Sequence, residues 1–475
     1  MTFNLSKNYI INILFSFIPI SFVAGNLILN LNILLILFSS FMFYGREIFK
    51  INFFYLDKLI ILFFVYLLIV ALYNNIYVNY ISLSINDFTI INKALLYLRF
   101  LFLYVVLRYL IEKELINFKL FFFSCGLSTL FVSLDLIYQF YFGSDIFGFK
   151  IVNPRRMSGP FGSELIAGSF LQRFSVFAFF LIIIFLKDQK IKFKNIFLVS
   201  FFSILFFSLI ISGNRIPFVF FTLMIFLIII LEKQLRKYLI SYLILVVTIF
   251  TISYNASYHI NNHFRHLVIQ SYHLLHQFDD QYAEKIFEEK KGYHCRQGRK
   301  TEDGSDSAGK YTVESKKESE ACNERVRKRY AAVIDGKEIH LVNAYTKELY
   351  IGYKTWLLNK YFGGGIKSFR LNCSKVAINC QTHPHNYYLE ILADIGLVGF
   401  ILLLIIFFAI FYETFLKRYL KHTDLKNNLI IIPFMYLFFT EIFPIKTTGS
   451  FFTTSNAAYI FLIMAITIAL SRKKN

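Results

Sequence analysis

Long apolar runs dominate this chain and limit it to one broad class of fold. An α-helix needs about 20 mostly apolar residues to cross a bilayer. The 475-residue chain is 56% hydrophobic, with a mean hydropathy of +0.55, which excludes an ordinary soluble globular protein. The pattern predicts an all-α polytopic membrane protein with about twelve transmembrane helices, at residues 8–24, 26–44, 57–76, 91–112, 117–142, 165–186, 195–211, 215–232, 238–254, 388–414, 427–445 and 455–471.

Basic residues lie mainly in the short links between these runs. A net charge of +20 would favour nucleic acid as a partner of a soluble protein, but here Lys and Arg recur on alternate links. Because cytoplasmic links are enriched in Lys and Arg, the alternation places both termini in the cytoplasm of a bacterial inner-membrane protein with no nucleic-acid partner. The first run lacks a cleavage site of small residues, so we expect an anchor and not a signal peptide.

The same orientation places one long segment, residues 254–387, on the periplasmic side. It contains nine of the ten histidines and four of the five cysteines. It separates an N-terminal membrane bundle of about nine spans, at 1–253, from a C-terminal bundle of about three, at 388–475. We expect this periplasmic loop to be mostly helical, with a polar insertion at about 279–340 whose composition is typical of a solvated segment.

The cysteines of the outer segment predict disulfides, because the periplasm is oxidising. Pairing of Cys373 with Cys380 and of Cys295 with Cys322 is the simplest of the three possible connectivities. Zinc is the alternative, but the spacing lacks the CxxC pairs of structural zinc sites. Cys125 lies in an apolar run and is expected to serve packing. We predict no metal site.

Residues 254–278 carry histidines at helical spacing. These are His259, His263, His266 and His273. An amphipathic helix on the membrane surface explains the pattern, and a metal cluster is the alternative.

Residues 347–373 have the apolar period of a helix, which we expect the glycines at 363–365 to end. This helix carries Trp356, the single tryptophan of the chain. Core packing is one interpretation of Trp356, and a platform for stacking a sugar is the other.

The stretch THPHNYYLEILADIGLVGF, at 382–400, places two imidazoles at the entrance to an apolar run. Asn386 suits the N-cap of the following helix. The positive end of a helix disfavours a charged His385, which leaves a neutral ring that can accept a proton. Glu390 and Asp394, one turn apart, are candidates to orient a ring or bind sugar hydroxyls. Alternatively, both histidines lie in a loop and have no functional role.

Charged residues inside apolar runs are costly and usually face a cavity or one another. Those expected in the outer half of the membrane are Arg99, Arg173, Arg215, Asp135 and Glu441. An Arg99–Asp135 ion pair is one explanation. The other is a cationic site for a diphosphate, joined by Arg155 and Arg156 from the outer loop, because guanidinium groups bind phosphate oxygens bidentately.

These motifs resemble the O-antigen ligase and polymerase superfamily of bacterial envelope glycosyltransferases. The ligase motif is His, then Asn, Ser or Gln, nine residues, Gly, two residues and Gly. It is matched by His385, Asn386, Gly396 and Gly399. A small or β-branched residue is expected three positions later, and Leu402 departs from that pattern. Further likenesses are SGNR at 212–215, the segment at 155–173 and GGGIKSFR at 363–370.

The resemblance implies a GT-C-like bundle and a role for each matching residue. His385 is the implied catalytic base. The implied contacts to substrate or pyrophosphate are Arg215, Arg156, Arg370, Arg173, Arg99, His383, Asn386 and Glu390. Arg265 is the alternative to Arg370 as the arginine of the large loop.

The implied reaction moves a glycan from undecaprenyl pyrophosphate to a hydroxyl of a lipid A–core acceptor on the periplasmic side. No nucleotide sugar, metal or other cofactor is expected. A polymerase, which joins the glycan to another lipid-linked glycan, is the alternative within the superfamily. A transporter or flippase of lipid-linked sugars is the non-enzyme alternative, but the chain has no clear repeat between its halves.

Overall fold

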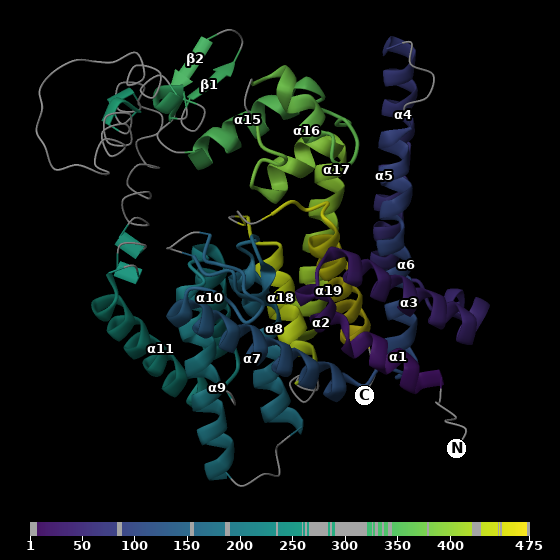
Figure 1. The fold of residues 1–475 in the computed structure, drawn as a ribbon. Coiled ribbons are helices and arrows are strands. Elements are labelled where there is room, and N and C mark those ends of the chain that lie inside the picture. The colour runs from purple at the N-terminus through teal and green to yellow at the C-terminus, as the bar shows by residue number, and fades with distance from the viewer. Residues whose placement is uncertain are drawn as a thin grey trace, which may run out of the picture.

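The protein, described by a computed structural model, is a bundle of long helices with a smaller helical cap at one end (Figure 1). The structure describes residues 7–82, 88–152, 156–185, 191–233, 236–258, 344–377, 380–419, 429–444, 446 and 449–472, and short stretches between 260 and 340. The all-α class is confirmed, with one addition in the outer segment. A two-stranded antiparallel hairpin pairs β1 (Ala331–Ile334) with β2 (Lys337–His340), and Ala331 lies opposite His340.

Eight helical segments of the described chain are long and apolar enough to span a membrane. They are Asn26–Lys50, Tyr55–Ile76, Thr89–Glu112, Phe118–Phe142, Ala167–Ile184, Leu239–Ala256, Tyr387–Lys417 and Thr454–Arg472. The shorter apolar helices are Lys7–Val23, Leu198–Ile211, Arg215–Leu231 and Ile431–Glu441. Each segment overlaps one of the predicted runs. The multi-pass membrane class is therefore confirmed, whereas the number twelve stays a prediction.

The helices follow one another along the chain as the apolar runs do. The first half contains α1 (Lys7–Ser16), α2 (Ile18–Val23), α3 (Asn26–Tyr44), α4 (Tyr55–Ser82), α5 (Thr89–Tyr97), α6 (Arg99–Glu112), α7 (Phe118–Phe142), α8 (Ala167–Phe180), α9 (Ile191–Ile211), α10 (Arg215–Leu231) and α11 (Arg236–Ala256). The second half contains α15 (Ala344–Leu358), α16 (Phe369–Asn372), α17 (Tyr387–Phe411), α18 (Ile431–Glu441) and α19 (Thr454–Arg472). Short 3-10 helices cover Gly45–Lys50, Gly159–Phe161 and Cys373–Lys375, and π-helical turns cover Leu181–Phe185 and Tyr412–Tyr419.

The centre of the bundle is apolar and rich in aromatic rings. Around Phe434 of α18, ring centroids of Phe121, Phe122 and Phe177 lie 4.8–6.3 Å away. The last helix, α19, packs on α6 and α18, and 89% of its most apolar window is buried inside the protein. This packing suits a bilayer, where helices associate through close contact and not through exclusion of water.

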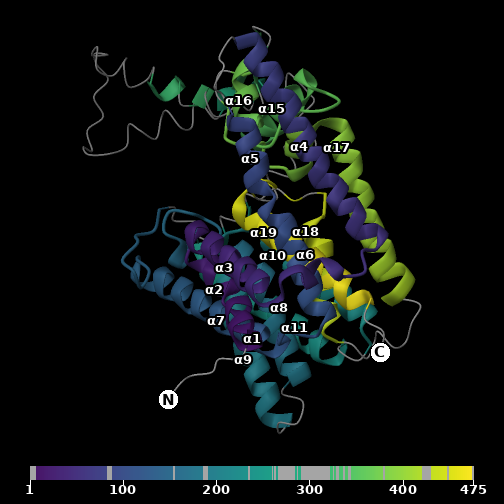
Figure 2. The same cartoon turned by 90° about the vertical axis from the view of Figure 1, so that its right-hand side faces the viewer.

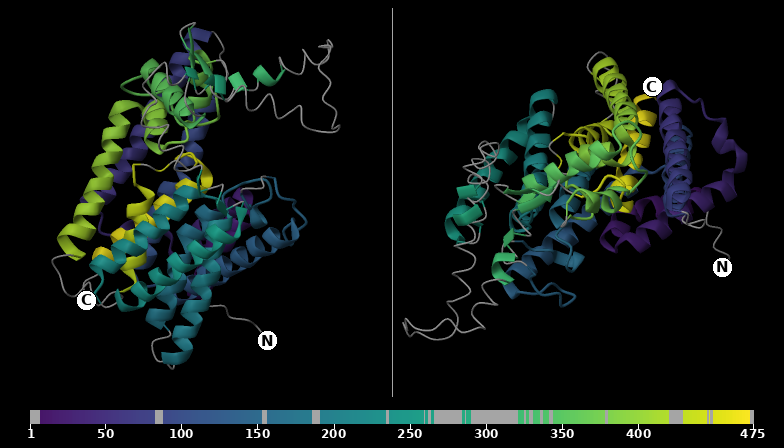
Figure 3. Two further views of the ribbon diagram at one scale, coloured as in Figure 1. Left: turned by 90° about the vertical axis from the view of Figure 1, so that its left-hand side faces the viewer. Right: turned by 90° about the horizontal axis from the view of Figure 1, so that it is seen from above.

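The cap consists of α15, α16 and the turns around them, and it lies beside the upper end of α4 (Figure 2). α17 leads from the cap into the bundle and packs along α4, as Figure 2 and both views of Figure 3 show. Trp356 packs on the small core of the cap with Ile351 and Phe369, and its indole N–H donates to Lys360 O at 2.9 Å. These contacts agree with the packing interpretation of the tryptophan.

α17 is broken at Gly396, which has φ 68° and ψ −175°. The cap replaces the helical hydrogen bonds that the break removes: Leu397 N donates to Lys360 O at 2.9 Å, and Val398 N to Tyr361 O at 3.1 Å. In the other direction, Gly365 N donates to Asp394 O at 2.7 Å. α15 ends at Leu358, before the glycines at 363–365, so their role differs from the predicted helix stop: they bring the cap backbone against α17.

Candidate functional site

The histidine stretch forms a tight turn in front of α17. His385 has a positive φ of 52°, which is uncommon for a residue other than glycine. Its carbonyl oxygen accepts a hydrogen bond from the Tyr345 hydroxyl at 3.3 Å. Asn386 caps α17 as predicted, because its side chain accepts from Tyr388 N and Leu389 N at 3.0 and 3.1 Å. The turn therefore fixes His385 directly before the positive end of a helix.

The two imidazoles of this turn lie against each other. The ring centroids of His383 and His385 are 4.4 Å apart, and the Thr382 hydroxyl lies 3.0 Å from His383 Nδ1. Burial lowers the pKa of His385 below its ordinary value of 6.5. Burial, with a smaller contribution from His385, lowers the pKa of His383 to about 4. Both rings are therefore neutral at neutral pH, and a neutral imidazole can accept a proton.

The segment after α18 connects this turn to α10. The Asn386 side chain donates to Pro444 O at 3.4 Å, and the Tyr388 hydroxyl donates to Ile442 O. The neighbouring Phe443 packs against Phe220 of α10, with ring centroids 5.5 Å apart. The histidine turn and α10 therefore share one supporting segment.

Arg215 is the first residue of α10, after a turn in which Gly213 has φ 62°. The outer loop reaches the same turn, because Met157 N donates to Ile211 O at 3.3 Å. Arg156, next to Met157, is half-buried, and burial lowers the pKa of its guanidinium. The structure thus brings the SGNR turn and Arg156 together.

Arg173 lies in a buried network that the sequence did not predict. Its guanidinium donates to Glu441 Oε1 at 2.6 Å, Glu441 Oε2 at 3.3 Å and Asn456 Oδ1 at 2.7 Å. Lys446 is 3% exposed and pairs with the same carboxylate, and its ammonium lies 5.2 Å from the centre of the Tyr387 ring. Arg173 was expected to bind pyrophosphate, but these donors are committed inside the bundle, next to the first residue of α17.

Glu390 and Asp394 are buried and have protein partners. Glu390 accepts from the Ser450 hydroxyl and from Phe451 N. Asp394 accepts from Lys367 N at 2.7 Å, and from the side chain of Ser368 and the backbone of Phe369. Their oxygens hold the cap and the 450–451 turn onto α17, and this differs from the sugar-binding role that their spacing suggested.

Arg99 begins α6, and Arg370 lies in α16 of the cap. Arg99 donates to Leu96 O at 3.0 Å and to the Thr454 hydroxyl at 3.2 Å. The suggested Arg99–Asp135 ion pair is wrong, because Asp135 instead accepts from Ile146 N at 2.9 Å. Arg370 is exposed on α16. In Figure 1, α6 and α10 lie on opposite sides of α18 and α19.

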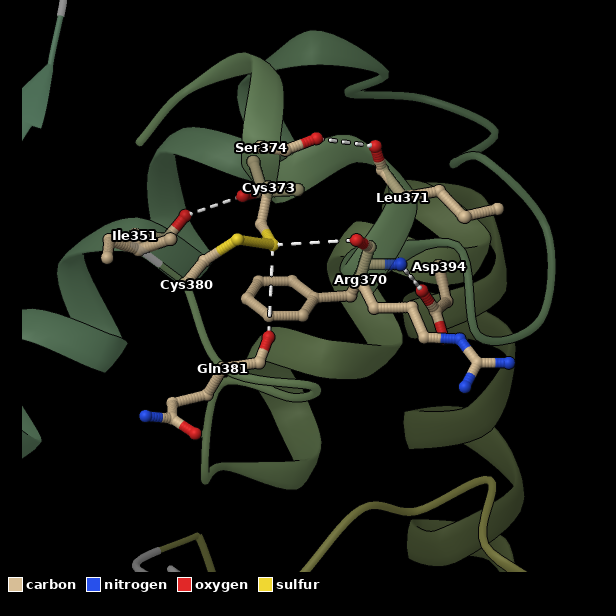
Figure 4. The surroundings of a disulfide bond; sticks show 10 residues. Ile351, Arg370, Leu371, Cys373, Ser374, Cys380, Gln381 and Asp394 are labelled. Carbon is tan, nitrogen blue, oxygen red and sulfur yellow. Dashed lines mark hydrogen bonds between the residues drawn. A yellow bond between two sulfur atoms is a disulfide. The ribbon is translucent and has the colours of Figure 1, made fainter. Parts of the chain in front are cut away.

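Cys373 and Cys380 form a disulfide in the cap, with Cα atoms 6.1 Å apart. In Figure 4, the Arg370 side chain points away from this disulfide, toward the side of Asp394. Cys322 is also disulfide-bonded, while Cys295, its predicted partner, lies outside the described residues. Cys125 is free and buried in α7.

Among the described residues, no group of three or more His, Cys, Asp or Glu side chains is placed to hold a metal ion. The suggested cluster of His259, His263, His266 and His273 lies outside the described residues, as does most of the 279–340 insertion. Arg265, the alternative loop arginine, has an exposed side chain.

Sequence reasoning missed two residues near the histidine turn, Tyr345 and Lys446. Tyr345 precedes the turn by 40 positions, and no local pattern marks it as a partner of His385. Lys446 could have been found, because it directly follows the predicted apolar run 427–445. Glu441 lies inside that run, and a lysine at its end suggests a partner for the acid.

Residues 199–404 match a family model described as O-Antigen ligase, which covers the SGNR turn, the outer segment and the histidine motif through Gly399. No curated protein matches the chain.

Proposed function

We propose that this chain, as a member of the O-antigen ligase and polymerase superfamily, is an O-antigen ligase that moves a glycan from undecaprenyl pyrophosphate to a lipid A–core hydroxyl. The observation that carries the proposal is the position of His385. Its ring is kept neutral by burial, and its backbone is fixed by Tyr345 and by the Asn386 cap. A fixed, neutral imidazole suits a general base.

In the proposed reaction, His385 removes the proton of the acceptor hydroxyl. The hydroxyl oxygen forms a bond to the anomeric carbon of the donor glycan while the bond to the pyrophosphate oxygen breaks. The pyrophosphate leaves with the electron pair of that bond, and Arg215 and Arg156 stabilise its charge. The shared 442–444 segment and the Met157–Ile211 hydrogen bond support this grouping.

Replacement of His385 tests the base. A general base contributes about 10²–10⁴-fold, so His385→Ala should lose transfer by that factor while the protein still folds and inserts. His340→Ala, a half-buried histidine on the hairpin, is the matched control and should keep wild-type activity. Transfer by His385→Ala within a few-fold of wild type would contradict the proposal.

The geometry of Arg215 gives an independent test. Lysine keeps the charge but loses the planar fork that binds two phosphate oxygens. Arg215→Lys should therefore transfer glycan poorly, with a larger loss than Lys233→Arg, a charge-preserving change just beyond the other end of α10. Equal transfer activity of the two purified variants would contradict the proposed contact between Arg215 and the pyrophosphate.

The acceptor separates ligase from polymerase. In a deletion strain, loss of a ligase leaves polymer on the lipid carrier and bare core on the gel, whereas loss of a polymerase leaves core with one repeat. We expect the first pattern. The second would assign the chain to the polymerase alternative in the same superfamily.

The proposed site lies on the periplasmic side of the inner membrane, with both termini in the cytoplasm. The Cys373–Cys380 disulfide supports this orientation, because disulfides persist in an oxidising compartment. A phosphatase reporter inserted near residue 300 should be active. We also propose that transfer needs no metal, so that it should survive EDTA, and restoration by magnesium of an EDTA-inactivated enzyme would overturn this.

A further inference from the structure

Tyr387 is the first residue of α17 and lies two positions after His385, the proposed base. Its side chain is buried, and its hydroxyl makes two hydrogen bonds to charged groups. The hydroxyl donates to Glu441 Oε1 at 3.2 Å and accepts from the Arg173 guanidinium at 3.4 Å. The ammonium of Lys446 lies 5.2 Å from the centre of the tyrosine ring. Tyr387 is therefore held at its hydroxyl and at its ring.

The carboxylate that accepts from Tyr387 is itself fixed by other groups. Arg173 of α8 donates to both oxygens of Glu441, at 2.6 and 3.3 Å, and Lys446 pairs with one of them. The same guanidinium donates to the side-chain oxygen of Asn456 in α19 at 2.7 Å. Because these bonds are charge-assisted and come from three helices, the acceptor of the tyrosine hydroxyl has a defined position.

The neighbours of Tyr387 in the sequence are anchored to the residues that follow α18. The Asn386 side chain donates to Pro444 O at 3.4 Å, and the Tyr388 hydroxyl donates to Ile442 O. Three consecutive side chains at the start of α17 thus bind the end of α18 and the chain directly after it. Tyr387 differs from the other two because its acceptor is a buried carboxylate.

The conformation of His385 depends on contacts on both sides of it. Its φ of 52° is a strained backbone conformation, which persists only where the surrounding structure holds it. On the preceding side, Pro384 packs against α15, since a Cβ at Gly352 would lie 2.8 Å from Pro384 Cβ, and the Tyr345 hydroxyl donates to His385 O. On the following side, Tyr387 fixes the first residue of α17.

We propose that Tyr387 is a positioning residue for the proposed base: its hydroxyl, bound by Glu441 and Arg173, holds the histidine turn so that the His385 ring reaches the acceptor hydroxyl. This inference rests on the proposed function. It also gives the buried ion pair a part in the reaction that involves no contact with substrate, in place of the pyrophosphate contact that the sequence suggested for Arg173.

The test compares two tyrosines of the same network in the full-length protein, purified in detergent. Tyr387→Phe removes only the hydroxyl that binds Glu441 and Arg173. Tyr459→Phe is the matched control, because Tyr459 is also buried, its hydroxyl donates to Arg173 O at 3.1 Å, and its ring lies 4.6 Å from the same guanidinium. The hydroxyl of the control bonds to α8, whereas that of Tyr387 fixes the turn.

Glu441→Asp provides a second variant that leaves the tyrosine in place. It keeps the negative charge that Arg173 and Lys446 require, but the shorter side chain draws the acceptor away from Tyr387. We expect it to change the kinetics in the same direction as Tyr387→Phe.

Two measurements are made on each variant. In turnover assays, Tyr387→Phe should lower kcat about tenfold and leave KM for donor and acceptor within twofold of wild type, because misplacement of a base affects the transition state and not the binding of substrates. In hydrogen exchange followed by mass spectrometry, amides of the peptide 382–390 should exchange at least tenfold faster. Tyr459→Phe should stay within twofold of wild type in both measurements.

Three results would overturn the inference. They are a kcat of Tyr387→Phe within twofold of wild type, an equal loss of kcat in Tyr387→Phe and Tyr459→Phe, and a rise in KM in place of a fall in kcat, which would make Tyr387 a substrate contact. Hydrogen exchange is read without turnover. If His385→Ala kept its transfer activity, the proposed function would fail, while the exchange data would still report whether Tyr387 fixes the turn.

Discussion

The break in α17 provides the sharpest test of the structure. Gly396→Ala places a Cβ 2.3 Å from Tyr361 O, at a backbone conformation that is open almost only to glycine. The strain alone costs about 1–3 kcal/mol. Relief of the clash requires Tyr361 to move, which breaks the hydrogen bonds from Leu397 N and Val398 N, each worth about 0.5–1.5 kcal/mol. The expected loss in the free energy of unfolding is therefore about 2–6 kcal/mol.

Substitutions at two other glycines separate the cost of backbone strain from the cost of the clash. Gly148→Ala has a φ of 87° with open space around the new Cβ, so it measures backbone strain alone, about 1–2 kcal/mol. Gly126→Ala has ordinary helical geometry and a new Cβ 3.4 Å from Ala178 Cβ, so it should be nearly neutral.

The assay is unfolding of the purified protein in detergent, followed by tryptophan emission. Trp356 is the single tryptophan, and its N–H donates to Lys360 O, which also accepts from Leu397 N. The signal therefore arises at the contact that the substitution disturbs. A stability of Gly396→Ala equal to that of Gly126→Ala would refute the reasoning.

Because burial lowers the pKa of His385 below 6.5, its ring stays neutral as the pH falls to 6.5. We therefore expect kcat to decline only below pH 6.5, and a pH profile of kcat with its midpoint at or above 6.5 would contradict the assignment of the base. Reduction of the Cys373–Cys380 disulfide should cost about 2–3 kcal/mol. Dithiothreitol should therefore lower the free energy of unfolding of the wild type by that much more than it lowers that of Cys373→Ser, which keeps the disulfide of Cys322. Glu441→Gln leaves two buried cations without their carboxylate and should cost about 3–5 kcal/mol, so a smaller loss than that of the exposed Glu47→Gln would be evidence against the network.

The sequence predicted what depends on local pattern. The apolar runs correspond to helices, and the Asn386 cap was read from one residue type at the start of a run. The glycines of the histidine motif were recognised only as a resemblance. The structure gives their physical reason: Gly396 breaks α17, and Gly399 leaves room for the Tyr66 ring, which a Cβ would approach to 2.6 Å.

The charge partners could not be predicted from the sequence, because they depend on packing. Arg173 and Glu441 are 268 residues apart in the sequence. Nothing in the sequence pattern distinguishes Asp135 from other acids as a partner of Arg99. Which charges meet is decided when α8, α18 and α19 pack together. The positive φ of His385 and Lys367 likewise depends on tertiary contacts, because neither residue is a glycine, and their residue types do not predict this backbone conformation.

The position of α19 has a consequence for biogenesis. α19 is made after the other described helices, it is the most buried of the eight candidate spans, and it contacts α6 and α18. Until α19 has been made and inserted, the surfaces of α6 and α18 that it covers stay exposed in the membrane. A nascent chain stalled before residue 454 should consequently stay accessible to insertion chaperones and membrane proteases, however complete its outer cap already is.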